Sequence, residues 1–296
     1  MNSAAPRSMS TTIEQTRDVS AARLHQLTEG ELAHWRCEQG CRVIAHRGRF
    51  WMERPRGFLQ PLHWMARLSL KEASAPAVPA WGFRAVLAES EADAANGALP
   101  VHVLTDVAGY TLQNLSPNRR NHLRRCYKRA IIVEITGPAL LRQQGYEVLQ
   151  SALHRTGYAR AGSKEDYLAS LDQYVTPRRR VVIGALIDGR LGGYLAGFAV
   201  DGTAYLEQVH LSTEALSDYV GIGLAFEFVR ACQRSKGILE IIYGQHSRED
   251  APLCSFKERI GFPVRHFPTR VRVMPIVAQL LRWRYPHKYY RLTGRG

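Results

Sequence analysis

The sequence predicts an α/β protein of the α+β kind, in which a mixed, mainly antiparallel sheet is flanked by helices. Two Asp-Gly pairs, Asp188-Gly189 and Asp201-Gly202, separate three apolar runs, which is typical of an antiparallel meander with tight turns. Helical and strand patterns then alternate, which gives the order β-β-β-α-β-α-β and implies helices packed on a sheet.

The elements before the meander are predicted from turn and capping signals. Residues 43–46 and 50–52 flank Arg47-Gly48-Arg49, so we expect a hairpin in which the glycine adopts a positive φ. Ser116-Pro117 predicts the start of a helix, because serine is favoured at the N-cap and proline at the first helical position.

The meander and the elements after it follow from the apolar runs. We expect strands at 181–187, 191–200 and 203–211, a helix from Val220 to just before Gly237, a strand at 238–243, a helix at 252–260 and a strand at 270–274.

We expect the 296 residues to divide into four parts. Residues 1–22 form a flexible tail, 23–112 an N-terminal region, 113–275 the main domain and 276–296 a basic, aromatic C-terminal tail. Basic and aromatic side chains alternate over 279–291, and such a segment can contact bases and phosphates, lie on an anionic membrane, or pack back onto the domain.

The composition is globular but strongly basic. Hydrophobic residues make up 45% and charged residues 22%, which excludes disordered and collagen-like chains. Lys and Arg total 40 against 26 acidic residues, and a net charge of +14 favours a polyanionic partner such as RNA, a phosphorylated cofactor or an anionic membrane. No apolar run reaches the roughly 20 residues of a membrane-spanning helix, so we expect a cytoplasmic protein without a transmembrane segment.

The cysteines do not indicate a disulfide framework or a metal site. There are five, widely scattered, and His34, Cys37, Cys41 and His46 lack the spacing of a common zinc finger. We therefore expect no metal and interpret the cysteines as free thiols. The phosphate-loop, nucleophile-elbow and HExxH motifs are also absent from the sequence.

The helix that begins at Ser116 is unusually basic. Six cations fall within eleven residues, and no acidic residue occurs between Ser116 and Val133. Such charges repel one another, so a bound phosphate would stabilise the helix; the alternative is a solvated face neutralised by acidic residues elsewhere.

The helical spacing of this segment suggests which side chains face outward. Leu123, Tyr127 and Ala130 are expected to face the core, with Arg120, Arg124 and Lys128 in a stripe on another face. The candidates for binding nucleic acid or phosphate are Arg119, Arg120, Arg124, Arg125 and Lys128.

The predicted element order, a glycine pair at the start of the second helix and the ending Lys-Glu-Arg-Ile-Gly-Phe of the shorter one resemble the GNAT acyltransferase superfamily over residues 116–274. Members of that superfamily bind the donor pyrophosphate on a loop written R/Q-x-x-G-x-G/A. The corresponding segment here runs from Asp218 to Gly223, with a carboxylate at the Arg/Gln position. The resemblance implies that acyl-CoA is bound by Gly221, Ile222, Gly223 and Leu224; alternatively, the glycines serve only close helix packing.

A second resemblance points to one branch of the superfamily. The short helix usually ends in a motif whose tyrosine protonates the leaving thiolate, but here Lys257 follows Phe256 at that place. The Phe-Lys pair and the basic helix resemble the Fem-like branch, whose better-known members transfer amino acids from aminoacyl-tRNA to peptidoglycan precursors. Because Fem-like enzymes contain two GNAT-type halves, residues 23–112 are expected to form a degenerate first half.

The resemblance also implies roles for individual residues. Glu207 and His210 are candidate bases, and Val209 is the candidate backbone N–H donor for the oxyanion. Lys257 would stabilise the oxyanion or hold a 3′-terminal phosphate of a tRNA, with Tyr243 as a second proton donor. The alternatives are a rim glutamate, a core histidine, a solvent-facing lysine and a packing tyrosine.

These observations predict an N-acyltransferase that moves an acyl group from acyl-CoA to an amine of a small molecule or peptide. A Fem-like aminoacyltransferase that uses aminoacyl-tRNA is the first alternative. The second is a non-catalytic RNA-binding protein on a GNAT scaffold.

Overall fold

The computed structural model describes residues 15–157, 161–176 and 178–295, and the chain divides into two compact units. Unit 1 contains the described parts of Met1–Gln26 and Thr105–Ile241, and unit 2 those of Leu27–Leu104 and Ile242–Gly296. The boundaries fall within β2 (Gln26–Leu27) and β12 (Glu240–Gln245). This division differs from the boundaries expected at residues 22, 112 and 275, because each unit is assembled from two segments that are separated in the sequence.

The sheet of unit 1 contains the predicted meander. Its order is β1-β8-β9-β10-β11, and all neighbouring strands are antiparallel. The bounds are β1 (Thr16–Asp18), β8 (Ala130–Ile135), β9 (Val181–Ile187), β10 (Arg190–Val200) and β11 (Thr203–Leu211). The expected flexible tail of residues 1–22 therefore extends too far: β1 pairs with β8, and Ala22 is completely buried.

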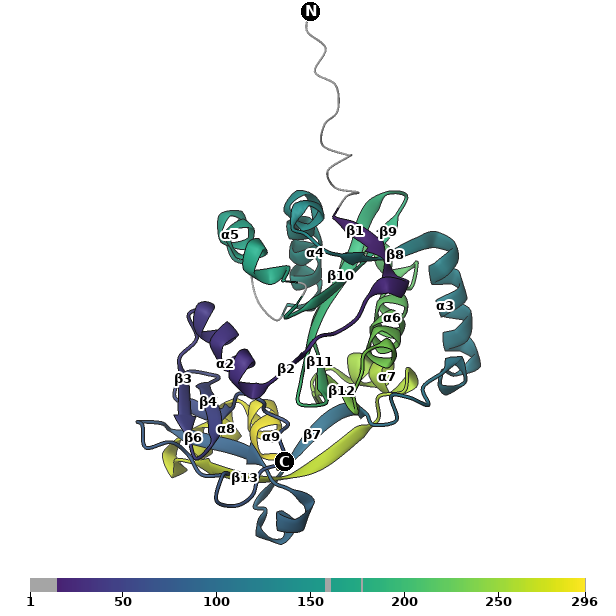
Figure 1. Cartoon of the computed structure of the whole chain (residues 1–296). Helices are drawn as coiled ribbons and strands as arrows, with labels where there is room; N and C mark the ends of the chain where they lie inside the picture. The colour runs from purple at the N-terminus through teal and green to yellow at the C-terminus, as the bar shows by residue number, and fades with distance from the viewer. Residues whose placement is uncertain (1–14, 158–160, 177, 296) are drawn as a thin grey trace, which may run out of the picture. The chain divides into compact units, whose positions relative to one another are not determined.

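Helices lie on both faces of this sheet (Figure 1). On one face are α4 (Tyr146–Thr156), preceded by the π-helical turn η4 (Leu141–Gly145), and α5 (Lys164–Tyr174); α6 (Val220–Arg234) covers the other face, with α3 (Pro117–Arg129) beside it. Three short 3-10 turns complete the unit: η1 (Val19–Ala21), η3 (Leu112–Asn114) and η5 (Glu214–Leu216).

Unit 2 has a sheet whose strands come from two separate segments of the chain, residues 43–104 and 264–273. Its order is β7-β13-β6-β5-β4-β3, in which only the β5–β6 pair is parallel among these described strands. The bounds are β3 (Val43–His46), β4 (Arg49–Glu53), β5 (Phe58–Pro61), β6 (Gly82–Val86), β7 (Gly97–Leu104) and β13 (Val264–Val273). Its helices are α2 (Glu29–Glu38), the 3-10 helix η2 (Glu89–Ala94), α7 (Ala251–Arg259), α8 (Pro275–Arg284) and α9 (Pro286–Thr293).

The prediction of mixed, mainly antiparallel sheets flanked by helices is confirmed. The hairpin turn at Arg47 and Gly48 has φ values of 51° and 77°, and the Ser116 side chain caps α3 as expected. One core assignment was wrong: Tyr127 is 44% exposed and its hydroxyl donates to Glu227 at 2.5 Å, whereas Cys126 is completely buried. The reason is that α3 packs sideways onto α6 as well as onto the sheet.

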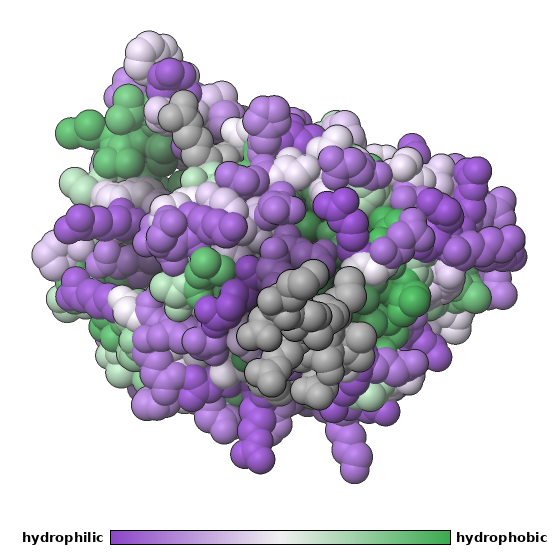
Figure 2. Space-filling view, turned by 90° about the horizontal axis from the view of Figure 1, so that it is seen from above, coloured by the Kyte–Doolittle hydropathy of each residue, from purple (hydrophilic) through white to green (hydrophobic). Residues whose placement is uncertain are grey.

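Each unit has its own apolar core. In unit 1, Ile135, Leu141, Val148, Leu171 and Tyr194 join the sheet to α4 and α5. In unit 2, Trp51 and its neighbours form a separate cluster. On the face shown in Figure 2, hydrophilic residues predominate and hydrophobic ones form separate patches, as the globular composition predicts.

Gly223 gives a direct test of the contact between α3 and α6. A Cβ on Gly223 would lie 2.5 Å from Cys126 Sγ, which is far inside van der Waals contact. We expect Gly223→Ala to lower the free energy of unfolding by ~1–3 kcal/mol, and Cys126→Ala in that background to restore most of it. Urea unfolding measures both effects.

The control for this test is Gly162→Ala, because no atom lies within 4 Å of a Cβ at Gly162. If Gly223→Ala is as stable as the unmodified protein, the two helices do not depend on the close approach.

Candidate functional site

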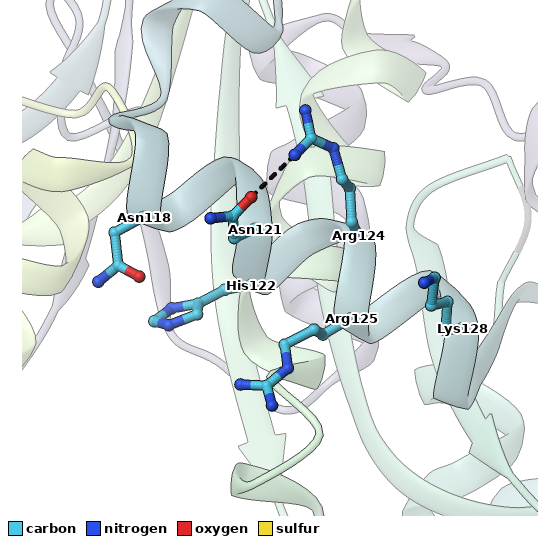
Figure 3. A pocket seen from close by; sticks show the side chains of 6 residues that line it. All are labelled: Asn118, Asn121, His122, Arg124, Arg125 and Lys128. Atoms are coloured by element: carbon cyan, nitrogen blue, oxygen red, sulfur yellow. Dashed lines mark hydrogen bonds between the residues drawn. The ribbon is translucent and has the colours of Figure 1, made fainter.

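Helix α3 carries a hollow of about 410 Å³ on its exposed surface (Figure 3). Six side chains of this one helix line it: Asn118, Asn121, His122, Arg124, Arg125 and Lys128. Arg124 Nη1 donates to Asn121 Oδ1 at 2.8 Å, which fixes one edge. Among the residues that the structure describes, three cations and no carboxylate line the hollow, so it is suited to an anion with several charged oxygens.

The structure divides the predicted basic stripe. The Arg120 side chain donates to Gln113 Oε1 at 3.2 Å and to the Leu115 carbonyl at 3.1 Å, so it folds back over the start of α3. Arg125 lines the hollow instead, together with Arg124 and Lys128. Arg119 and Arg120 do not line it. The charge pattern therefore indicated the helix, but only the folded side chains distinguish the cations of the hollow.

An aromatic pair lies at the edge of this hollow. The His122 ring stacks on the Tyr219 ring, with centroids 3.9 Å apart and planes inclined by 9°. The Arg125 guanidinium lies 5.7 Å from the Tyr219 ring centroid. Burial and the charges of Arg119 and Arg125 lower the pKa of His122, so the ring is neutral at pH 7. Sequence reasoning missed His122, because the pair forms only when α3 meets the residue before α6.

The start of α6 is less suited to a pyrophosphate than the glycine pair implied. Gly223 faces Cys126 and is used for helix packing, which is the alternative role considered from the sequence. The Ile222 N–H donates to the Tyr219 carbonyl at 3.1 Å, and the Ile222 and Leu224 side chains are buried. Gly221 alone of the four predicted donor-binding residues is partly exposed.

Carboxylates dominate the surroundings of this helix start. The Asp218 carboxylate accepts a hydrogen bond from Arg129 Nε at 3.3 Å, and this guanidinium offsets the negative charge of Asp218. A neighbouring pocket of about 540 Å³ nevertheless has four carboxylates and a single cation in its lining. The five charged groups are Glu147, Asp188, Glu214, Asp218 and Arg190. Such a lining disfavours a pyrophosphate and favours a cationic or neutral ligand.

Strand β11 has a bulge close to the position expected for the backbone donor. Gln208 pairs with Ala196 and Leu206 with Gly197, so Glu207 has no partner in β10. Val209, the expected N–H donor, is in register with Leu195. The irregular backbone therefore lies two residues before the expected position. A bulge re-aims side chains and backbone groups locally, and nothing in the sequence of β11 marks it.

The two candidate bases on β11 have different surroundings. The Glu207 carboxylate accepts from Arg180 Nη2 at 2.5 Å, and the Arg180 side chain is only 3% exposed. A carboxylate held by a buried guanidinium is a weak base. Burial lowers the pKa of His210 to about 4, so its imidazole is neutral at pH 7. Within the described residues this ring makes no hydrogen bond, so His210 is the better candidate.

Lys257, on α7 of unit 2, is buried and not solvent-facing. It is 7% exposed, its Nζ lies 5.1 Å from the Tyr243 ring centroid, and burial lowers its pKa to about 8. Within the part of the chain that the structure describes, Nζ forms no hydrogen bond or ion pair. A buried ammonium in this state can stabilise an anionic oxygen. Burial raises the pKa of Tyr243, which makes that phenol a weaker acid.

His102 is a further polar group near Lys257 that sequence reasoning missed. It lies on β7, is completely buried, and its Nδ1 is 3.0 Å from the Phe262 carbonyl oxygen. Its Nε2 has no hydrogen-bond partner in the described residues, and burial followed by the charge of Lys257 lowers its pKa to about 4. A buried neutral imidazole and a buried ammonium within unit 2 are typical of a functional site.

Across residues 15–157, 161–176 and 178–295, no group of three or more His, Cys, Asp or Glu side chains is placed to hold a metal ion. In the same residues, every helix is too short or too polar to cross a membrane.

Comparison with known proteins shows the fold. No family model and no curated protein matches this chain. FemX has a similar structure, with a TM-score of 0.58 and 9% identity over 89% of this chain and 96% of that chain. The C-terminal domain of a protein assigned as lysylphosphatidylglycerol synthetase from Agrobacterium fabrum is similar with a TM-score of 0.56 and 11% identity, over 97% of this chain and 96% of that chain. This chain therefore shares its fold with FemX and with that C-terminal domain.

The lowered pKa of Lys257 has a measurable consequence for stability. Its pKa falls from 10.5 to about 8 on folding, so between these values the unfolded chain binds the proton that the folded chain has lost. Stability therefore rises with pH over this range and is reduced below it. At pH 7 we expect the free energy of unfolding of Lys257→Met to be ~1–3 kcal/mol higher than that of the unmodified protein.

This difference narrows as the pH rises from 8 toward 10.5, which urea unfolding at several pH values measures. The matched control is Lys236→Met, since Lys236 is exposed. Parallel pH profiles for the unmodified protein and Lys257→Met would contradict the lowered pKa.

Proposed function

We propose that this protein is an N-acyltransferase that takes its acyl group from an aminoacyl-tRNA and delivers it to an amine of a small molecule or peptide. The observation that carries the proposal is the distribution of charge in unit 1. The α3 hollow presents three cations without a carboxylate, whereas the pocket beside the α6 start presents four carboxylates and one cation. The site for phosphates thus lies on α3 and not at the glycine pair.

The α3 hollow suits a nucleic acid in more than charge. Arg124 and Lys128 are one turn apart, which separates them by about 6 Å along the helix. One arginine guanidinium can donate two parallel hydrogen bonds to the oxygens of one phosphate. The stacked rings of His122 and Tyr219 also offer a flat face on which a base can stack. The fold shared with FemX over most of both chains supports the same donor, because Fem-like enzymes use aminoacyl-tRNA.

The proposed reaction transfers an aminoacyl group from an ester to an amine, and Lys257 is the candidate for stabilising the negative charge that develops. The acceptor amine attacks the ester carbonyl carbon, a C–N bond forms, and the C–O bond to the terminal ribose breaks. The positive charge of Lys257, which predominates below about pH 8, stabilises the developing oxyanion or the leaving oxygen. The attacking amine gives up a proton, and the leaving ribose oxygen takes up a proton as it departs.

Acyl-CoA is the second candidate donor, because Gly221 is partly exposed at the start of α6 and Arg129 offsets the charge of Asp218. The two donors are distinguished by incubating the purified protein with coenzyme A or with bulk tRNA and measuring binding by mass spectrometry. Coenzyme A binding without tRNA binding would replace the proposed donor.

The α3 hollow is tested by a triple variant, Arg124→Gln, Arg125→Gln and Lys128→Gln. We expect weaker tRNA binding and a shallower salt dependence, with the slope of log K against log salt reduced by about 2, since each phosphate contact contributes ~0.7. The matched control removes three exposed cations elsewhere in unit 1, at Lys164, Arg230 and Lys236. Equal tRNA affinity of the two triple variants would overturn the assignment of the hollow.

Lys257 is tested by transfer activity. We expect Lys257→Met to lower the rate of aminoacyl transfer by about 10²–10³-fold and to leave tRNA affinity unchanged, because the lost interaction forms mainly in the transition state. Lys236→Met is the control. If the unmodified protein binds tRNA but transfers no aminoacyl group to any amine offered, the non-catalytic RNA-binding alternative gains support.

A further inference from the structure

Helix α8 of unit 2 exposes an apolar stripe that the proposed transfer reaction does not use. Ile276 and Trp283 are each 79% exposed, and Leu280 is 52% exposed. Their spacing of four and three residues places them on one face of the helix, where they line a shallow hollow of about 290 Å³ together with Gln279. Met274, just before the helix, is also 51% exposed.

The opposite face of α8 already meets the protein. Val277, Ala278 and Leu281 are half-buried, so α8 is attached through one apolar face and shows a second to solvent. A surface helix normally has a polar outer face, and a run of exposed Ile, Leu and Trp side chains therefore indicates a surface that another phase or molecule covers.

The positive charge around the stripe indicates what kind of surface binds to it. From Gly261 to Gly296 the sequence contains eight Lys or Arg residues and no Asp or Glu. Arg284 and Lys288 are exposed beside Tyr285, with their charged groups 5.2 and 4.4 Å from its ring centroid. Apolar and tryptophan side chains with flanking cations are the pattern of a helix that lies in the interface of an anionic membrane.

RNA and a second copy of the chain fit these observations less well as binding partners of the stripe. Ile276 and Leu280 have no flat face on which a base can stack, so RNA would leave the apolar stripe without a partner. A second copy of the chain would bring two basic surfaces together without any acidic residue in this part of the sequence to pair with them.

We propose that α8 and the start of α9 form a docking surface for an anionic phospholipid bilayer, with Ile276, Leu280 and Trp283 inserted among the acyl chains and Arg284 and Lys288 at the lipid headgroups. This docking places the protein on a membrane and is independent of the donor proposed above. It requires no change in the fold, because the side chains involved are exposed.

The test is sedimentation of the full-length protein with large vesicles of phosphatidylcholine, with and without phosphatidylglycerol. We expect binding to the anionic vesicles only. Ile276→Ser with Trp283→Ser is expected to lower the partition coefficient at least tenfold, and each of Arg284→Gln and Lys288→Gln by about fivefold. The matched control is Ile131→Ser, since Ile131 is 71% exposed in unit 1.

A second measurement locates the inserted side chain. Brominated acyl chains quench tryptophan fluorescence on contact, so anionic vesicles that carry them should quench the unmodified protein more than Trp283→Phe. Absence of binding to anionic vesicles, binding that the α8 variants do not alter, or a dimer in solution that Ile276→Ser with Trp283→Ser dissociates would each overturn the proposal.

Discussion

The close packing of α3 on α6 is the constraint on which the candidate donor site depends. The Cys126 side chain of α3 packs against Gly223 of α6, and because Gly223 has no side chain the two helices approach closely. The approach places His122 on Tyr219 and Arg129 beside Asp218, although these residues are far apart in the sequence. The same contact explains how a helix without acidic residues is tolerated. Asp218, just before α6, pairs with Arg129 of α3, and the cations of the hollow face solvent, where a ligand can reach them.

Buried polar groups divide into paired and unpaired sets, and this difference separates structural from functional candidates. Arg180 and Glu207 form an ion pair, which compensates both charges and stiffens the bulged part of β11. Lys257 is buried, and no described residue pairs with it in this way, so its charged form reduces stability. Proteins keep such costs mainly where the group acts on a ligand, and the lowered pKa still leaves most of the ammonium protonated at pH 7.

The surplus of positive charge is concentrated in two places with different surroundings. On α3, Arg124, Arg125 and Lys128 occur with polar and aromatic neighbours, which suits phosphates and bases. After Gly261, the cations occur beside exposed aliphatic side chains and Trp283, which suits a lipid interface. A net charge of +14 is therefore not one signal, because the neighbours of each cation decide which polyanion it can serve.

The sequence by itself determined the meander, the capped start of α3, the basic character of that helix and the fold class, because these depend on turn residues, caps and periodicity within a few positions. Tertiary structure decided the rest. It joined two distant segments of the chain in unit 2, turned Arg120 away from the hollow and Arg125 toward it, placed the bulge at Glu207, and buried His102 near Lys257. These outcomes depend on which distant segments pack together, and no local pattern records the desolvation or the partners that a side chain acquires on folding.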